Sequence, residues 1–400
     1  MNKYFSLYQH CKYASGTLNG CIYNTLNGQM IKVNGELSRL LEESFHNIPQ
    51  DVNNKELLSL INLGYGDFYD SPTMHENYLK YENRQAKYNL MIGNINLYQV
   101  YIILESKCNL ECDFCNESNY VYTMTHCKKR AEFNTTLSVS EVLSILKKCK
   151  KMGARKLSII GGNPFLNFDI VKNIVESVKG YDTIQIYANI LQLDDNIITF
   201  LSDNNVELVV EIVQCSDIEF SNLIKLLENK INIKIDILLW KRTAVLVQDF
   251  YEKIMRIGEI QADNIIISNV YSPAFSANNV SIKKRAFHSF SSQSLELSEI
   301  YNSCLYGKIA IRLDGVVMPC PMMDNYVIGN LKYEKLTTLL SDSKYQTIIH
   351  YSRNKIKGCE KCAYKNNCFD CRSLEYSQSG VLDGCAYCEI NERLLSYDDQ

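Results

Sequence analysis

The sequence predicts an α/β protein: a row of parallel βα units, preceded by a small α+β unit and followed by a cysteine-rich segment. Between about residue 98 and residue 270, six apolar strand-like stretches alternate with stretches of helical spacing. The first 93 residues contain short strands and helices without that alternation. Eight cysteines lie between residues 304 and 388, with little apolar sequence around them. Alternating strands and helices are typical of parallel sheets, whereas a segment without a core needs metal or cross-links.

The bulk composition describes a globular chain and narrows the function classes. Of the 400 residues, 46% are hydrophobic, and the formal net charge is −3, so nothing indicates a nucleic-acid partner or an anionic membrane. The first residues, MNKYFSLYQH, lack the apolar region of a signal peptide, and no apolar run approaches the length of a membrane span. These features predict a cytoplasmic protein. Thiols stay reduced there, so the 16 cysteines point to metal binding rather than disulfides.

Residues 1–93 are expected to form the small α+β unit. Three strands are predicted at FSLYQHCKYA, GCIYNTL and QMIKVN, with a hairpin turn at Asn27-Gly28 between the last two. ELSRLLEESF and KELLSLINLGYG have the apolar spacing of helices. The polar run at 75–89 is expected to be a linker or a solvated helix.

The central βα array begins with the strand YQVYIILES at 98–106. A capping box from Ser138 to Glu141 starts the first helix, which is expected to end near Gly153. The further strands are KLSIIGG, TIQIYANI, VELVVEIV, IKIDILLW and NIIISNV, with helices between them that include 193–203, 217–229 and 245–258. Six strands with short connections favour a partial or complete barrel over a Rossmann sheet.

The stretch CNLECDFC places Cys108, Cys112 and Cys115 directly after the first strand. Thiolates are soft ligands that suit zinc or iron–sulfur clusters, and a closed zinc site wants four protein ligands. Three cysteines on a cubane cluster leave one iron open to a substrate or cofactor. Ligands of parallel βα arrays bind beyond the carboxyl ends of the strands, where Gly161 and Gly162 of IIGGNP also lie.

This CxxxCxxC motif, with Phe114 before the last cysteine, resembles the radical S-adenosylmethionine (SAM) superfamily. The resemblance implies a partial (β/α)6 barrel in which the three cysteines hold a [4Fe–4S] cluster and its open iron binds SAM. One-electron cleavage of SAM then produces a 5′-deoxyadenosyl radical that abstracts a substrate hydrogen. The residues implied to contact SAM are Gly161, Gly162, Asn163 and Pro164, with Asn163 standing where a glutamate is usual.

The C-terminal cysteines suit two four-ligand sites, for which zinc ribbons are the structural alternative. The eight are Cys304, Cys320, Cys359, Cys362, Cys368, Cys371, Cys385 and Cys388. With the Asp-Gly hairpin RLDGVVMPC, they resemble the SPASM extension of radical SAM enzymes, which binds auxiliary [4Fe–4S] clusters. The resemblance assigns Cys359, Cys362 and Cys368 to one cluster, with Cys385 or Cys388 as fourth ligand. It assigns Cys304, Cys320 and Cys371 to the other, which has an open iron or uses a cysteine of the last pair.

Five cysteines remain. Cys11, Cys21 and Cys149 are expected to be small buried side chains. Cys215, just past the fourth strand, and Cys127, in the polar insert after the cluster loop, are candidate catalytic thiols. Asn189 and Glu211 lie near strand ends, where a SAM contact and a structural role are equally open, so neither is assigned.

Three strands followed by helices at the N-terminus also resemble the leader-binding element of ribosomal peptide (RiPP) maturases, a winged-helix-like fold to which a peptide adds as a strand. The expected domains are therefore 1–93 for leader recognition, 94–290 for the barrel and 291–400 for the SPASM extension.

The predicted function is modification of a precursor peptide, by a thioether or C–C cross-link or a related change, with flavodoxin or ferredoxin as electron donor. The alternatives are an activator of a folded protein of the sulfatase-maturase type, a cluster-containing pseudo-enzyme or peptide-binding protein, and a zinc-stapled binding protein.

Overall fold

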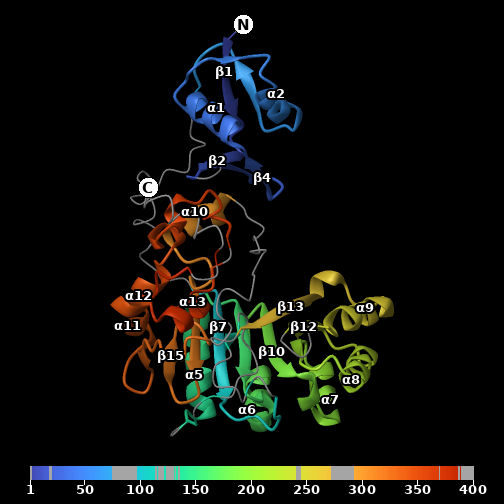
Figure 1. Ribbon diagram of the computed structural model, residues 1–400. Helices are drawn as coiled ribbons and strands as arrows, with labels where there is room; N and C mark the ends of the chain where they lie inside the picture. Colours follow the sequence, from blue (N-terminus) through green and yellow to red (C-terminus); the bar gives the residue numbers. More distant parts are fainter. Residues whose placement is uncertain are drawn as a thin grey trace.

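The computed structural model describes residues 2–17, 20–73, 97–112, 115, 121–122, 130, 132–133, 136–239, 245–271, 292–368, 370–385 and 388. Three parts follow one another along the chain: a small N-terminal unit, a sheet of parallel strands covered by helices, and a C-terminal segment that lies between them (Figure 1). The predicted α/β class with a partial barrel is confirmed. The run 75–89 and Cys127 lie outside the described residues.

The N-terminal unit contains two small antiparallel sheets, with strand orders β5-β1-β6 and β2-β3-β4. Its elements are β1 (Asn2–Leu7), β2 (Cys11–Ser15), β3 (Gly20–Asn24), β4 (Gln29–Val33), α1 (Gly35–Phe45), β5 (Gln50–Asp51), α2 (Lys55–Asn62) and β6 (Gly66–Tyr69). The prediction of one strand over FSLYQHCKYA is wrong. The chain turns where Cys11 N–H donates to the Tyr8 carbonyl at 2.8 Å, which divides the stretch between the two sheets. The predicted turn at Gly28 is present, with φ of 71°.

The six predicted central strands all form and lie parallel and adjacent in one sheet. They are β7 (Gln99–Glu105), β9 (Lys156–Gly161), β10 (Thr183–Asn189), β11 (Glu207–Ile212), β12 (Ile233–Leu239) and β13 (Ile265–Tyr271). The intervening helices are α5 (Val139–Lys151), α6 (Phe168–Ser177), α7 (Asp195–Asp203), α8 (Asp217–Glu228) and α9 (Val247–Ile257). The capping box of Ser138 and Glu141 is present at the start of α5. Alternate strand residues pack against these helices in the main apolar core.

The C-terminal segment extends the central sheet instead of forming a separate one. Strand β14 (Lys308–Arg312) pairs parallel with β7, and β15 (Val316–Met318) and β16 (Gly329–Asn330) continue the sheet. The helices here are α10 (Ser292–Ile300), α11 (Leu336–Ser341), α12 (Ser343–Ile349) and α13 (Arg372–Ser379). Because β7 takes β14 as its neighbour, the described strands form an open barrel, and its far edge is β13 with the two-residue strand β8 (Val121–Tyr122).

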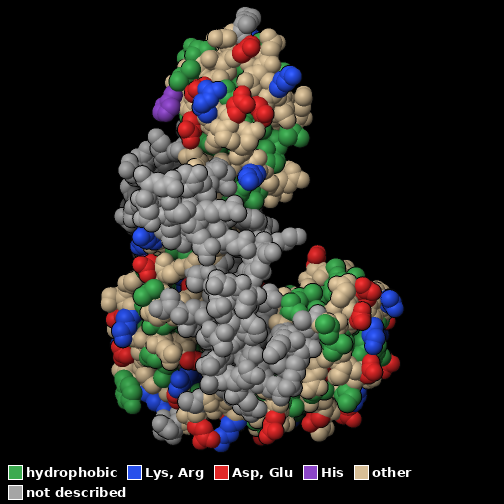
Figure 2. Space-filling view, viewed as in Figure 1, with side chains coloured by type: hydrophobic (Ala, Val, Ile, Leu, Met, Phe, Trp, Pro, Cys, Tyr) green, Lys and Arg blue, Asp and Glu red, His purple; other side chains and the backbone are tan. Residues whose placement is uncertain are grey.

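Acidic and basic side chains are interspersed over the described surface on the face shown in Figure 2, with no large area of one sign among them. This pattern agrees with the small net charge. Among the described helices, none combines the length and apolar character that crossing a membrane requires.

Candidate functional site

The three-cysteine loop leaves the carboxyl end of β7 in a turn that Glu105 organises. The Glu105 Oε1 atom accepts the N–H groups of Ser106 at 2.8 Å and Lys107 at 3.0 Å. The chain therefore turns away from the strand just before Cys108, which is half-buried. This places the first cysteine at the carboxyl edge of the parallel sheet, the edge predicted for the site.

Cys112 and Cys115 lie farther along the loop, above neighbouring strands. Their backbones are joined by a hydrogen bond from Cys115 N–H to the Cys112 carbonyl at 2.9 Å. Both pack against the small apolar cluster of Val213, just past β11, Leu238 of β12, and Met322 from the C-terminal segment. The two cysteines thus lie at the mouth of the open barrel, each packed on one side against apolar side chains.

Gly162, at the end of β9, lets the second strand approach the loop closely. Its N–H donates to the Glu105 carbonyl at 2.9 Å, and the next N–H, from Asn163, donates to the Lys107 carbonyl at 2.8 Å. A Cβ atom at Gly162 would lie 2.2 Å from the Lys107 carbonyl oxygen. Only glycine fits this close approach of two backbones. The glycine pair expected to contact SAM therefore also fixes the start of the cysteine loop.

Asn163 is buried and ties the strand end to the loop by its side chain. Its Nδ2 atom donates to Asn109 Oδ1 at 2.9 Å, and its Oδ1 atom accepts the N–H of Phe165 at 3.0 Å, which caps the short helix Pro164–Asn167. An amide oxygen has two acceptor positions, so Oδ1 retains capacity for one more donor.

Gln192 contacts the loop as well and was not found from the sequence. Its Nε2 atom donates to Cys108 Sγ at 3.2 Å and to the Gly162 carbonyl at 3.1 Å. A short helix, Ile190–Gln192, holds the side chain in place, because Asn189 N–H donates to Gln192 Oε1 at 3.2 Å. The local signal was a capping pattern after β10, which indicates a helix start and does not reveal a contact with a distant cysteine.

Arg130 is a second residue without a sequence signal, and it joins the loop region to the C-terminal segment. Its N–H donates to the Ser106 carbonyl at 3.0 Å, and its buried guanidinium donates to the Pro321 carbonyl at 3.1 Å. The same guanidinium forms an ion pair with Asp324 at 3.4 Å. The barrel mouth is therefore linked directly to the hairpin segment that carries Cys320.

Three buried polar side chains lie side by side on the inner face of the sheet. Asn189 of β10 is in register with Glu211 of β11, which is in register with Asp236 of β12. Residues on either side of Glu211, such as Val210, belong to the helix-covered core, so these polar groups face the other way. Asn189 also caps the helix after it, since its Oδ1 atom accepts the Leu191 N–H at 2.9 Å.

The structure brings Cys304, Cys320 and Cys371 together. Burial, with the Cys304 thiol nearby, raises the pKa of Cys320 to about 12. Burial, with the thiols of Cys304 and Cys320, also raises the pKa of Cys371 well above its ordinary value. Thiolates so close to one another repel, and a bound cation removes that cost.

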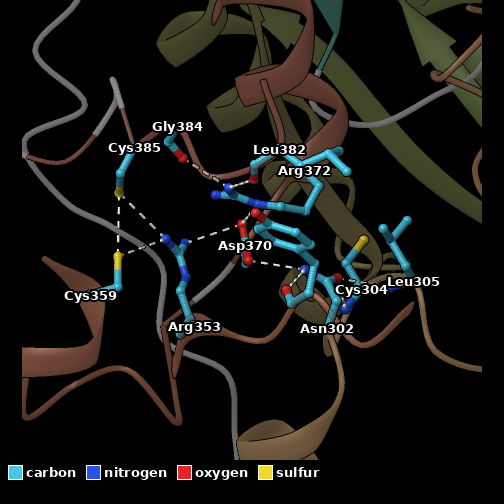
Figure 3. A network of polar contacts seen from close by, with 11 residues as sticks. Asn302, Cys304, Leu305, Arg353, Cys359, Asp370, Arg372, Leu382, Gly384 and Cys385 are labelled. Carbon is cyan, nitrogen blue, oxygen red and sulfur yellow. Dashed lines mark hydrogen bonds and ion pairs between the residues drawn. The ribbon is translucent and has the colours of Figure 1, made fainter. Parts of the chain in front are cut away.

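A second group forms around Cys359. Its Sγ atom lies 3.5 Å from Cys385 Sγ, and the Arg353 guanidinium donates to both sulfur atoms (Figure 3). Cys362 lies one turn on, where it packs against Cys21 and Tyr23 of β3. Cys368 follows in the same segment and is half-buried, and Cys388 is buried.

The remaining described cysteines are poor candidates for catalysis. Burial raises the pKa of Cys11 to about 11 and that of Cys149 to about 12, and it raises the pKa of Cys21 further. Cys215 follows β11 in a left-handed conformation with φ of 54°. Burial, with Glu219 nearby, raises its pKa to about 12. A thiol with a raised pKa is a weak nucleophile at neutral pH, which argues against Cys215 as a reactive group.

The chemistry of the cysteine groups suits iron–sulfur clusters. Within the described residues, no three His, Cys, Asp or Glu side chains are gathered tightly enough to hold one metal ion. A cubane cluster offers four separate irons and bridges thiols that are farther apart, and thiolates are its usual ligands. An open parallel barrel with a cysteine loop at its mouth and a cysteine-rich extension defines the class of iron–sulfur barrel proteins.

Comparisons with known proteins make the class specific. Residues 102–234 match the model of the radical SAM superfamily, and residues 296–371 match that of the SPASM iron–sulfur cluster-binding domain. The chain is a radical SAM/SPASM enzyme, and the two domains imply [4Fe–4S] clusters and SAM as cofactors.

Curated relatives include a GTP 3′,8-cyclase of Clostridium perfringens, 26% identical over 166 residues, or 37% of this chain and 46% of the relative. A probable GTP 3′,8-cyclase of Methanopyrus kandleri is 28% identical over 24% of this chain and 28% of its own. The chain thus spans less than half the length of these relatives.

Two solved structures share the fold. The structure of anSMEcpe with bound AdoMet matches 76% of this chain and 93% of its own, with 16% identity and a TM-score of 0.52. The structure of Streptococcus suis SuiB bound to the precursor peptide SuiA matches 95% of this chain and 97% of its own, with 18% identity and a TM-score of 0.50.

Proposed function

We propose that this protein is a radical SAM peptide maturase, in which Cys108, Cys112 and Cys115 hold a SAM-binding [4Fe–4S] cluster. The observation that carries the proposal is the placement of their loop at the carboxyl edge of the parallel sheet. Gly162 and Gln192 fix that loop by direct contacts with its backbone and with Cys108 Sγ. Thiolates on a rigid rim are suited to present an open iron toward the barrel interior.

When bound, the cluster and SAM supply a 5′-deoxyadenosyl radical that abstracts a hydrogen atom from the substrate. The residues of this chain hold the loop, in part through the packing of Val213, Leu238 and Met322 against Cys112 and Cys115. The Gly161–Pro164 segment lies beside the loop, where Asn163 Oδ1 keeps an acceptor position for a donor group of SAM. A cytoplasmic flavodoxin or ferredoxin is the proposed electron donor.

The C-terminal cysteines are proposed to hold two auxiliary clusters. Cys304, Cys320 and Cys371 form one ligand set, supported by their mutual proximity. Cys359, Cys362 and Cys368 form the other, and Cys385 is proposed as its fourth ligand because Arg353 contacts the sulfur atoms of both Cys359 and Cys385. Cys388 is then left for the first set, or that cluster keeps an open iron.

The proposed substrate is a precursor peptide whose leader pairs with the edge of β4. This strand lies at the edge of the sheet β2-β3-β4, and Gln29 and Lys32 on it are exposed. The same sheet contacts the cysteine segment, because Tyr23 OH donates to the Ala363 carbonyl at 2.6 Å and Thr17 N–H donates to the Lys361 carbonyl at 2.9 Å. The match to SuiB, solved with a precursor peptide, over 95% of this chain supports a counterpart to this unit.

The test uses the cognate precursor, sought among short open reading frames beside the gene. Reconstituted, reduced protein with SAM should change the mass of the precursor and release 5′-deoxyadenosine. Single substitutions Ile31→Pro and Lys32→Pro provide a matched pair. Neighbouring residues of a strand direct their N–H groups to opposite sides, so one variant disrupts the β3–β4 pairing and the other only the open edge.

The variant that disrupts only the open edge should still fold and load iron. It should bind the precursor at least about tenfold more weakly while uncoupled SAM cleavage continues. Unchanged peptide affinity and modification would remove the case for a leader-guided substrate. Activation of a folded protein would then be the better hypothesis for the function. Protein that loads zinc rather than iron would overturn the radical SAM assignment itself.

A further inference from the structure

A buried polar network separates the two C-terminal cysteine groups (Figure 3). Its members are Asn302, Arg353, Asp370 and Arg372, each no more than 5% exposed. Charged side chains are rarely buried to this extent unless they are paired. We call these four residues the Asp370 network.

Asp370 is the centre of the network and is shared by two guanidinium groups. Its Oδ1 atom accepts from Arg372 Nε at 2.5 Å and lies 3.4 Å from Arg353 Nη2. Its Oδ2 atom accepts from Asn302 Nδ2 at 2.9 Å. Both guanidinium groups therefore depend on this carboxylate for a buried ion pair.

The two arginines differ in what else they contact. Arg353 Nη1 donates to Cys359 Sγ at 3.4 Å and to Cys385 Sγ at 3.5 Å. Arg372 Nη1 donates to the carbonyls of Leu382 at 2.7 Å and Gly384 at 2.8 Å. Arg353 therefore directs a permanent positive charge at sulfur atoms, whereas Arg372 braces the backbone just before Cys385.

The other cysteine group meets the network through backbone atoms. Cys304 N–H donates to Asn302 Oδ1 at 3.0 Å, as does Leu305 N–H at 3.0 Å. The contact positions Cys304 and leaves its sulfur atom out of the hydrogen bond. The network therefore contacts sulfur atoms in the group of Cys359 and Cys385, but main-chain N–H groups at Cys304 and Leu305.

We propose that Arg353 selectively raises the reduction potential of the auxiliary cluster held by Cys359 and Cys385. The inference rests on the proposed assignment of the C-terminal cysteines as cluster ligands. Reduction takes the cluster from [4Fe–4S]2+ to [4Fe–4S]+ by one electron and leaves no other bond changed. Hydrogen bonds to the ligand sulfurs and a nearby positive charge stabilise the more negative, reduced form. Arg353 is a positioning and tuning residue, and the cluster of Cys304, Cys320 and Cys371 serves as an internal reference.

The experiment uses the full chain with Cys108→Ala, Cys112→Ala and Cys115→Ala, so that only auxiliary clusters remain. Stepwise reduction by dithionite is followed by electron paramagnetic resonance, with and without Arg353→Gln. At a fixed potential, the ratio of reduced to oxidised cluster should fall about tenfold for one cluster, which equals about 59 mV for one electron. The other cluster should change less than about twofold. Arg353→Lys keeps the charge and should recover part of the shift.

A second measurement covers the case in which Arg353→Gln does not load iron. With 15N-labelled arginine, the reduced chain with Arg353 intact should show nitrogen hyperfine coupling to one auxiliary cluster, and Arg353→Lys should lose it. Equal potentials in a fully loaded Arg353→Gln chain, or no nitrogen coupling, would overturn the tuning role alone. A chain that binds no auxiliary iron would overturn the cluster assignment as well.

Discussion

The two cysteine regions of this protein are stabilised by different physical means. The loop of Cys108 to Cys115 is held by main-chain groups at the end of an apolar sheet, with Gly162 N–H on the Glu105 carbonyl and Asn163 N–H on the Lys107 carbonyl. The C-terminal group of Cys359 and Cys385 is held by buried charged side chains, with Asp370 and Arg353 at the centre.

This difference follows from what each part of the sequence can bury. The central strands supply alternating apolar residues to a large core, so the loop needs only a close backbone approach. The C-terminal segment has little regular structure after α12, and a buried polar network takes the place of apolar contacts there. Such a network stabilises only while every member is paired, because an unpaired buried charge is costly.

The largest effect is expected at the barrel mouth. Changing Cys108, Cys112 and Cys115 together to Ala should abolish the formation of 5′-deoxyadenosine from SAM. Iron should fall from about 12 to about eight per chain, because the auxiliary clusters have their own ligands. Iron analysis and chromatography of the SAM products measure both. Equal turnover by the variant would show that radical chemistry does not depend on this loop.

The next effect tests the polar network. Asp370→Asn leaves two buried guanidinium groups without their shared carboxylate, so the free energy of unfolding should fall by about 3–5 kcal/mol. Chemical denaturation and iron content measure the loss, which should concentrate on auxiliary iron. Asp383→Asn, at an exposed position in the same segment, is the control and should change stability little. An Asp370→Asn chain as stable as the parent would show that the network is not needed.

A smaller effect tests the backbone approach at the barrel mouth. Gly162→Ala places a methyl group 2.2 Å from the Lys107 carbonyl oxygen, and the required shift costs about 1–3 kcal/mol. We expect SAM binding and cleavage to weaken by about tenfold to a hundredfold, while auxiliary iron is retained. Gly35→Ala is the control, since a Cβ there meets nothing within 4 Å. Full SAM cleavage by Gly162→Ala, measured at limiting SAM, would contradict this role for the glycine.

The features predictable from the sequence were those with local periodicity or spacing. The six central strands follow from apolar runs, the start of α5 from Ser138 and Glu141, and the cysteine motifs from their spacing. The prediction failed at the first N-terminal stretch, because its residues alternate through the turn at Tyr8 and give no sign that the two halves join different sheets.

The contacts between distant segments had no sequence signal. Gln192 reaches Cys108 across 84 positions, Arg130 reaches Pro321 across 191, and Arg353 lies in a short polar turn with no motif. An arginine in such a turn is ordinarily solvated, so its burial depends on cysteines brought in from elsewhere. Pairing of strand β14 with β7 is another long-range event that periodicity does not reveal.

The smallest effect tests whether the N-terminal unit helps hold the cysteine segment. Tyr23→Phe removes the hydroxyl that donates to the Ala363 carbonyl at 2.6 Å, and a hydrogen bond of this kind contributes about 0.5–1.5 kcal/mol. Hydrogen exchange of residues 361–368 should therefore increase about three- to tenfold, because local opening becomes easier. Tyr13→Phe is the matched control, since this equally buried tyrosine hydrogen-bonds Ser38 within the N-terminal unit. It should leave exchange of 361–368 unchanged. Equal exchange in all three proteins would mean that the C-terminal segment is stabilised by its own network and ligands, and that the N-terminal unit only rests on it.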